Sequence, residues 1–237
     1  MKVSIVIPVF NESENIINEI EALKNKVSEP FKINIVYDFD EDTTIPVVKK
    51  LQKKYSDINL IKNKYGRGVL NAIKTGFETS DSKYTVVTMA DLSDPPEVIN
   101  KMIQKADDEE ADIVCASRYM NGGKQIGGPL IKGILSRCAG VSLKYLAGVD
   151  THDATNSFKL YRTSFLKSQT IESTGGFELG LELVVKAHNL GKKICEVPTV
   201  WTDRIAGKSN FKIIEWLPSY LKWYFYAFRK KFKGKIS

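Results

Sequence analysis

The amino-acid sequence predicts an α/β fold in which a mostly parallel sheet is flanked by helices. The first observation is a short run rich in β-branched residues, Val3 to Phe10, which is typical of a buried strand. The second is the segment after it, where Ile16, Ile20, Leu23 and Val27 recur at helical spacing and form one apolar stripe. The third is the repetition of this strand–helix unit along the first half of the chain, which implies right-handed crossovers between parallel strands.

Helix starts can be predicted from capping residues. Asn11, with Glu14 three residues later, predicts a capping box ahead of the first helix. Asp94, followed by two prolines and Glu97, predicts another helix start with Asp94 as its cap. The remaining elements expected in this half are strands at 33–37, 59–61, 84–89 and 111–116, and helices through 47–55 and 69–76.

The second half of the chain is less regular. A helix is expected over 130–146, a strand over 158–161, a helix over 177–190 that ends at Gly191, and a strand over 193–200. No repeat or linker-like composition interrupts this order. We therefore expect one domain over residues 1–211 and an amphipathic, basic and aromatic extension over residues 212–237.

Composition limits the classes of function. The chain has 237 residues, 43% of them hydrophobic and 27% charged, as in an ordinary globular protein. Its net charge of +7 favours an anionic partner: nucleic acid, an anionic membrane surface or a phosphorylated substrate. Cys115 and Cys195 lie in strand-like runs and are expected to be buried free thiols, which suits a reducing cytoplasm. No run of about 18 apolar residues is available to span a bilayer.

Acidic residues follow two of the predicted strands, at the edge where open α/β sheets bind ligands. Asp91 comes after the strand that ends near Met89, and it neither caps a helix nor lies in an obvious turn. Such a residue can ligate Mg²⁺ or Mn²⁺, hard cations that bridge substrate phosphates. We therefore expect Asp91 to bind a divalent cation, and Asp94 to be a plain helix cap.

Two other segments leave alternatives open. Asp38, at the end of the second strand, could accept a hydrogen bond from a nucleobase, or its acidic segment could be only a turn. Gly66, Arg67 and Gly68 precede a helix, so their backbone amides could approach a phosphate. A plain turn explains these two glycines equally well.

The order of these segments resembles that of family 2 glycosyltransferases, which have the Rossmann-like GT-A fold. The similarity is greatest to polyprenyl-phosphate sugar synthases of the dolichyl-phosphate mannose synthase type, and it covers about residues 1 to 211. Each motif alone is weak, whereas their shared order is specific. The segments that carry it are Val6–Glu12, Ile35–Asp38, Tyr65–Gly68, Ala90–Glu97, Ser117–Tyr119, Ser136–Arg137, Asp153–Phe158, Phe177–Glu182, Glu196–Pro198 and Arg204–Ser209.

The chain also departs from the family pattern. Met89 stands where the first carboxylate of an Asp-x-Asp motif is usual, so one carboxylate of that motif is missing. Asn210 stands where a lysine is usual after Ser209. These departures concern the binding of the metal and of the acceptor phosphate.

The resemblance implies a nucleoside diphosphate sugar as donor and inversion of the anomeric centre by in-line attack. It implies a catalytic and metal-binding role for Asp91, with Mg or Mn as cofactor, and a catalytic role for Arg204. Acceptor phosphate contacts would come from Arg118, Ser136 and Arg137. Donor contacts would come from Pro8, Phe10, Asn11, Glu12, Asp38, Gly66, Arg67, Gly68, Ala90 and Ser93.

The acceptor decides whether a general base is needed. A polyprenyl phosphate, undecaprenyl or dolichyl, is already anionic and needs cationic contacts only. A saccharide hydroxyl would require a base, for which Glu182 is the candidate. A third hypothesis is a non-catalytic, degenerate transferase that has lost the carboxylate at position 89.

The C-terminal extension bears on the acceptor. Aromatic residues between Trp216 and Phe228 are followed by a cluster of lysines, a composition suited to lying on a membrane surface. The alternatives are a helix packed on the domain or one that forms a homo-oligomer. We expect a peripheral protein at the cytoplasmic face of the membrane, and we expect no nucleic acid partner because no nucleic-acid-binding motif is evident.

Overall fold

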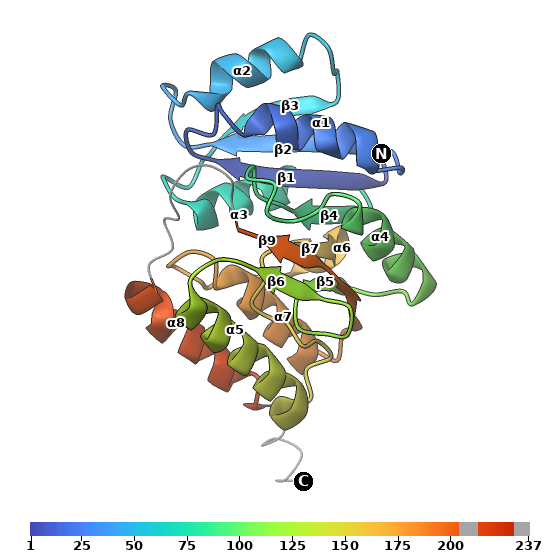
Figure 1. Ribbon diagram of the computed structural model, residues 1–237, viewed down its shortest axis with the longest axis vertical. Helices are drawn as coiled ribbons and strands as arrows, with labels where there is room; N and C mark the ends of the chain where they lie inside the picture. The colour runs from blue at the N-terminus through green and yellow to red at the C-terminus, as the bar shows by residue number, and fades with distance from the viewer. Residues whose placement is uncertain (204–212, 230–237) are drawn as a thin grey trace.

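The computed structural model describes residues 1–203 and 213–229, and its centre is a seven-stranded sheet in the order β3-β2-β1-β4-β7-β5-β8 (Figure 1). Neighbouring strands pair in parallel, except that β7 runs antiparallel to β4 and β5. The strands are β1 Val3–Val9, β2 Phe31–Tyr37, β3 Ile58–Lys62, β4 Tyr84–Val87, β5 Ile113–Ser117, β7 Lys159–Arg162 and β8 Ile194–Pro198.

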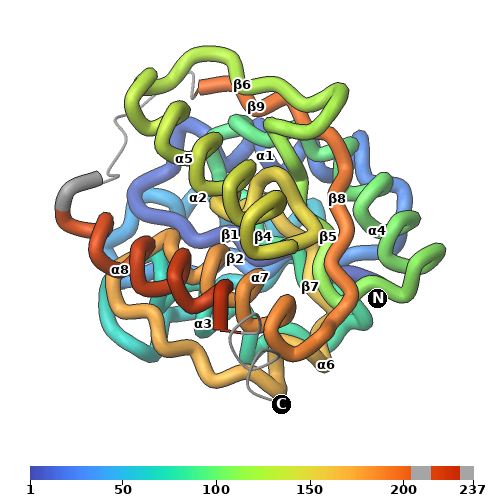
Figure 2. The backbone as a smooth tube through the Cα atoms, turned by 90° about the horizontal axis from the view of Figure 1, so that it is seen from below, coloured from blue at the N-terminus to red at the C-terminus, as the bar shows by residue number. Residues whose placement is uncertain are grey.

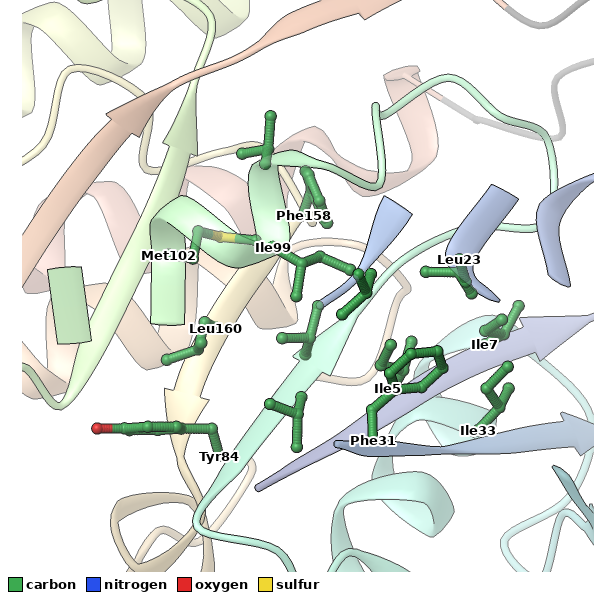
Figure 3. Packing of buried hydrophobic residues seen from close by; sticks show 14 of the residues in the cluster. Ile5, Ile7, Leu23, Phe31, Ile33, Tyr84, Ile99, Met102, Phe158 and Leu160 are labelled. Carbon is green, nitrogen blue, oxygen red and sulfur yellow. The ribbon is translucent and has the colours of Figure 1, made fainter. Parts of the chain in front are cut away.

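Helices cover both faces of this sheet, as the alternating pattern predicts. On one face, α1 and α4 pack on the strands through residues such as Ile20, Leu23 and Met102, part of the cluster drawn in Figure 3. On the other face, α3, α6, α7 and α8 share a second cluster. The helices are α1 Ile16–Lys26, α2 Thr44–Leu51, α3 Val69–Thr79, α4 Val98–Asp108, α5 Leu130–Ser142, α6 Thr163–Ser168, α7 Leu179–Asn189 and α8 Ile213–Tyr226.

A small parallel sheet extends the main one. It pairs β6, Lys124–Ile126, with β9, Val200–Thr202. This pairing continues that of β5 with β8. At the ends of those two strands, the Thr199 backbone amide donates to the Ser117 carbonyl at 3.1 Å. This sheet, which the sequence does not predict, leads the chain from β5 into α5, the helix that continues as a π-helix, η1, over Leu143–Ala147.

The two predicted helix caps are wrong. Helix α1 begins at Ile16 with Asn15 as its N-cap, and Asn11 instead has a positive φ of 55° in the loop before it. Helix α4 begins at Val98, so Asp94 lies outside its first turn and is buried. Both residues lie instead in loops that follow the carboxyl ends of strands β1 and β4. The predicted end of α7 is confirmed, because Gly191 follows it with φ of 69°.

Helix α8 packs on the domain through part of its surface. Trp223 is 1% exposed, and its indole nitrogen donates to the Ser173 hydroxyl at 3.1 Å. Tyr224 donates to the Ser142 hydroxyl of α5 at 3.0 Å, and α5 and α8 lie close together in Figure 2. The 211/212 boundary expected from the sequence falls outside the described residues. In the described part of the chain, no helix is long and apolar enough to cross a membrane.

Candidate functional site

The candidate site lies at the carboxyl ends of parallel strands β1, β2, β4 and β5, as expected for an open α/β sheet. Four loops leave the sheet there. They begin with Phe10 after β1, Asp38 after β2, Thr88 after β4 and Arg118 after β5. Residues far apart in the sequence thus meet at one edge, at the left of Figure 1 for β1 and β2.

The loops after β1 and β2 are joined by hydrogen bonds. Asp42 is buried, and its carboxylate oxygens accept from the Asn11 backbone amide at 3.2 Å each and from the Thr44 amide at 2.8 Å. The Glu12 amide donates to the Thr44 hydroxyl at 2.9 Å, and the Asn11 side chain accepts from the Thr43 amide at 3.1 Å. These bonds stabilise the left-handed backbone of Asn11, a conformation that asparagine adopts more readily than most residues.

Asp38 is joined to the glycine segment that the sequence also assigns to the donor. Its carboxylate accepts from the Gly68 amide at 2.9 Å and from the Asn63 side chain at 2.8 Å. Asn63 donates in turn to the Gly66 carbonyl at 2.6 Å. Gly66 and Gly68 have φ of 86° and 123°, values that favour glycine, so both are required by the turn itself. Asn63, which sequence reasoning missed, bridges Asp38 and Gly66 and so adds to the direct bond from Gly68.

The loops after β1 and β2 also carry an aromatic pair, an exposed Phe10 and a half-buried Phe39. Phe10 and Phe39 meet edge to face with ring centroids 5.6 Å apart, and the Arg67 guanidinium lies 4.8 Å from the Phe39 ring centroid. Phe10 is 52% exposed although it is a large apolar side chain at the end of a buried strand. Flat apolar rings with a neighbouring cation can stack on a planar nucleobase. Phe39 was not among the predicted donor residues.

The loop after β4 carries Asp91. Its carboxylate accepts from the Ser93 backbone amide at 3.1 Å, and the side chain is largely buried. Leu92 between them has φ of 56°, which is strained for a leucine and is retained where the surroundings impose it, commonly at functional sites. Ser93 is buried and its carbonyl accepts from the Thr202 amide of β9 at 3.0 Å. Ala90 and Pro8, predicted donor contacts, lie inward: Ala90 packs in the core and Pro8 is within β1.

Asp94 is part of the site. It is 4% exposed, and its Oδ1 has no hydrogen-bond partner among residues 1–203 and 213–229. Burial, with a smaller contribution from the Asp91 carboxylate, raises the pKa of Asp94 to about 7, while the Arg118 guanidinium opposes the increase. This environment is unlike that of a helix cap, which lies at a surface and binds backbone amides. The spacing of Asp94 from Asp91 was visible in the sequence, but its burial was not.

Arg118 and Ser136, two predicted phosphate contacts, are brought together. The Arg118 guanidinium donates to the Ser136 hydroxyl at 2.9 Å and makes two bonds to Asp153, at 2.7 and 2.9 Å. Asp153 is fully buried; burial alone would raise its pKa, but Arg118 lowers it, so the carboxylate is ionised. Arg137, the third predicted contact, is exposed on α5. Arg204 lies outside the described residues.

Glu182 stabilises the segment that precedes α7. Its buried carboxylate accepts from the backbone amides of Glu172 and Ser173 at 2.7 and 2.8 Å and from the Lys186 ammonium at 2.7 Å. These three donors occupy the oxygens that a general base would need and hold the segment before α7 in place. The role of Glu182 as a base stays a prediction that this geometry does not favour.

Sequence reasoning also missed Glu19 of α1. Its side chain is fully buried, and burial, followed by the charges of Asp94 and Asp91, raises its pKa to about 8. A signal was present, because Glu19 follows Ile16 by three residues and precedes Leu23 by four, so it lies on the apolar stripe of the helix.

The family follows from comparison with known proteins. The model of glycosyl transferase family 2 matches residues 4–169, more than half of the chain, and the chain belongs to this family. The resemblance inferred from motif order is thereby confirmed.

The names of individual relatives indicate more specific activities than the family description does. Dolichol-phosphate mannosyltransferase of Pyrococcus furiosus is 30% identical over 217 residues, which cover 90% of this chain and 60% of that protein. Polyprenol monophosphomannose synthase of Mycolicibacterium smegmatis is 27% identical over 228 residues, with 90% and 85% covered. This chain thus spans three fifths of the length of the Pyrococcus relative.

A solved structure confirms the fold class. The mannosyltransferase of Pyrobaculum calidifontis, in complex with GDP-Man and Mn²⁺, superposes with a TM-score of 0.64 at 14% identity, covering 88% of this chain and 58% of that one. At this identity the likeness establishes the GT-A fold alone.

Proposed function

We propose that this protein is an inverting glycosyltransferase that moves a hexose from a nucleoside diphosphate sugar to a polyprenyl phosphate. The observation that carries the proposal is the placement of two oppositely charged centres at one edge of the sheet. The acidic loop of Asp91 and Asp94 suits a cation and a diphosphate, and Arg118 with Ser136 suits an acceptor phosphate. The Arg118 and Asp94 side chains are close enough for each to shift the pKa of the other.

The residues present fit a divalent cation. Asp91 offers a carboxylate at a strand end, and Asp94 has a buried oxygen without a partner in the described part of the chain. Carboxylate oxygens are the ligands that Mg²⁺ and Mn²⁺ prefer. Within the described residues, no three acidic, histidine or cysteine side chains form a ready metal site. We therefore assign the remaining ligands to the diphosphate and to water. A cation held there would act as a Lewis acid that neutralises the diphosphate leaving group.

The other residues of the donor site bind the nucleotide sugar and orient it. Asp38 and the amide of Gly68 lie together, where they can contact the nucleoside, and Phe10 with Phe39 can stack on its base. The bonds from Asp42 keep the two loops fixed before the donor arrives, which lowers the entropy cost of orienting it.

The acceptor half needs no base. A lipid phosphate is already a nucleophilic anion, so Arg118, Ser136 and Arg137 have only to hold it in line with the anomeric carbon. Asp153 keeps the Arg118 guanidinium in one orientation, and the pKa of Arg118 stays raised despite burial, because the Asp153 charge outweighs desolvation. Charge-assisted bonds of this kind contribute roughly 1.5–3 kcal/mol each.

An apolar surface beside Ser136 supports a lipid acceptor. Helix α5 has one fully buried residue, Gly140, although most of its side chains are apolar, and Leu130 is 83% exposed. The neighbouring α8 adds exposed apolar side chains of its own. The exposed members of this surface are Leu130, Ile131, Ile134, Leu135, Leu217, Leu221 and Phe225. An amphipathic surface of this kind suits peripheral contact with a bilayer.

We further propose that this contact occurs at the cytoplasmic face of the membrane. The three cysteines are all free, and Cys138 is an exposed thiol on α5, which suits a reducing compartment. Most of the basic tail expected to meet the anionic headgroups, from residue 230 onward, lies outside the described residues.

The test is transfer in a defined mixture. The purified protein is incubated with a panel of nucleotide sugars and Mg²⁺ or Mn²⁺, with and without undecaprenyl phosphate, and sugar is counted in the organic phase. We expect lipid-dependent product that requires the cation. Transfer to an added saccharide alone would favour the saccharide-acceptor hypothesis, and the absence of transfer and of hydrolysis would favour a degenerate transferase.

A further inference from the structure

Helix α1 buries a carboxylate close to the Asp91 loop. Glu19 lies between Ile16 and Leu23 on the buried face of the helix and is 0% exposed. Among the described residues, neither of its carboxylate oxygens has a hydrogen-bond partner of good geometry, and the nearby Thr88 hydroxyl lowers its pKa only in part. The charged groups that act on it most strongly are Asp94 and Asp91. Glu19 is thus a buried carboxyl group within electrostatic range of two others.

A buried carboxylate lowers the stability of the fold unless a hydrogen-bond donor or a cation compensates its charge. An unpaired carboxylate is strongly disfavoured in an apolar interior, and neighbouring carboxylates add repulsion. Burial and these like charges raise the pKa of Glu19 to about 8. Asp94 is in a similar position, with a buried and unpartnered Oδ1. Native proteins keep such groups where function requires them, because an apolar side chain would otherwise be more stable.

Position 89 holds an apolar methionine, so additional negative charge for a cation at Asp91 has to come from another element. Met89 packs with the cluster on the α3 and α7 side of the sheet. The neighbours of Glu19 on α1, Ile16 and Ile20, pack in the cluster on the opposite side. The apolar side chain at position 89 and the buried carboxyl group of α1 thus lie on opposite faces of the sheet.

We propose that Glu19, with Asp94, supplies from the buried side of the Asp91 loop the negative charge that a divalent cation at Asp91 requires and that Met89 does not provide. This inference rests on the proposed function, which places the cation at Asp91. Glu19 acts through its charge and not as a ready ligand, since the described residues contain no preformed set of three metal-binding side chains. A cation at Asp91 would favour the ionised form of Glu19, which is largely protonated at neutral pH in the absence of the cation. Charges act strongly across a buried, low-dielectric region, so direct coordination is unnecessary.

Two substitutions test the proposal: Glu19→Leu, which fits the apolar stripe, and Glu19→Gln, which keeps the shape. Mn²⁺ binding is titrated by electron paramagnetic resonance with UDP as probe and, separately, with GDP. Thermal unfolding is measured without metal. We expect Mn²⁺ affinity to fall about tenfold or more in both variants, the scale known for groups next to metal ligands. Measured above pH 8, where Glu19 is ionised without the metal, Glu19→Leu should meanwhile raise the metal-free Tm by about 2–4 °C or more, because the buried charge is gone.

A matched control is Glu14→Gln, which removes the same charge from an exposed position just ahead of α1. It should change neither the Mn²⁺ affinity nor the Tm. Asp91→Asn separates the inference from the proposed function. Wild-type Mn²⁺ affinity in both Glu19 variants, together with its loss in Asp91→Asn, would overturn the role of Glu19 alone. Wild-type affinity in Asp91→Asn as well would overturn the cation site itself. Should Glu19→Leu fail to fold, Glu19→Gln decides the question.

Discussion

The ion pair of Arg118 and Asp153 gives the prediction that follows most directly from distances. Asp153 is 0% exposed and the Arg118 side chain 8%. The carboxylate accepts from the Arg118 backbone amide at 3.1 Å, from Nε at 2.7 Å and from a terminal nitrogen at 2.9 Å. Asp153→Asn keeps the shape but removes the charge, and its amide nitrogen faces donors. A buried guanidinium then remains uncompensated.

The expected loss in the free energy of unfolding is about 3–5 kcal/mol, the cost of breaking a buried pair on one side. For a chain of this length it corresponds to a fall in Tm of about 6–20 °C. Thermal unfolding followed by circular dichroism measures it, with the exposed Asp150→Asn from the same segment as a control that should leave Tm unchanged. A loss below about 1 kcal/mol, the scale of a surface ion pair, would refute this reasoning.

Three further predictions concern the site. Asp91→Asn, which can still accept from the Ser93 amide, should lower turnover on the order of 10²–10³ with little change in Tm; near wild-type turnover would exclude Asp91 from catalysis. Glu182→Gln should lose about 1–3 kcal/mol of stability, because its new amide faces backbone donors, and turnover should stay within a few fold; a stable variant without turnover would instead make it the base. The pKa of Glu19 is raised in the fold, so its proton favours the folded state below pH 4.5, and this stabilisation is lost as pH rises through about 8. Between these values Tm should fall with pH in the wild type and fall less in Glu19→Gln; equal slopes would contradict the assignment.

The sequence was sufficient for the parallel part of the fold because its signals are local. Strand runs and helix stripes repeat from Val3 to Ser117, and each predicted element there exists in the structure. The antiparallel direction of β7 and the pairing of β6 with β9 were not predictable, because they depend on how the chain returns to the sheet after α5. No residue pattern in those short segments encodes a direction.

The sequence was sufficient to predict which loops form the site, but not the role of each side chain in it. The positions of Asp38, Asp91 and Arg118 at strand ends follow from alternation alone. Capping rules failed at Asp94 because the same residue type that caps a helix also suits a buried acidic site. Asn63 and Glu19 were missed because their roles arise from contacts with distant segments, Asp38 in one case and the Asp91 loop in the other.

The most direct test of the proposed function is the anomeric configuration of a lipid-linked product. The wild-type protein is incubated with the nucleotide sugar that it accepts, Mn²⁺ and undecaprenyl phosphate, and the product is extracted into the organic phase and examined by ¹H NMR. We predict a sugar bonded through phosphate to the lipid, with the configuration at its anomeric carbon opposite to that of the donor. Retention of the donor configuration, or sugar released only as the free hexose, would contradict in-line transfer to a polyprenyl phosphate.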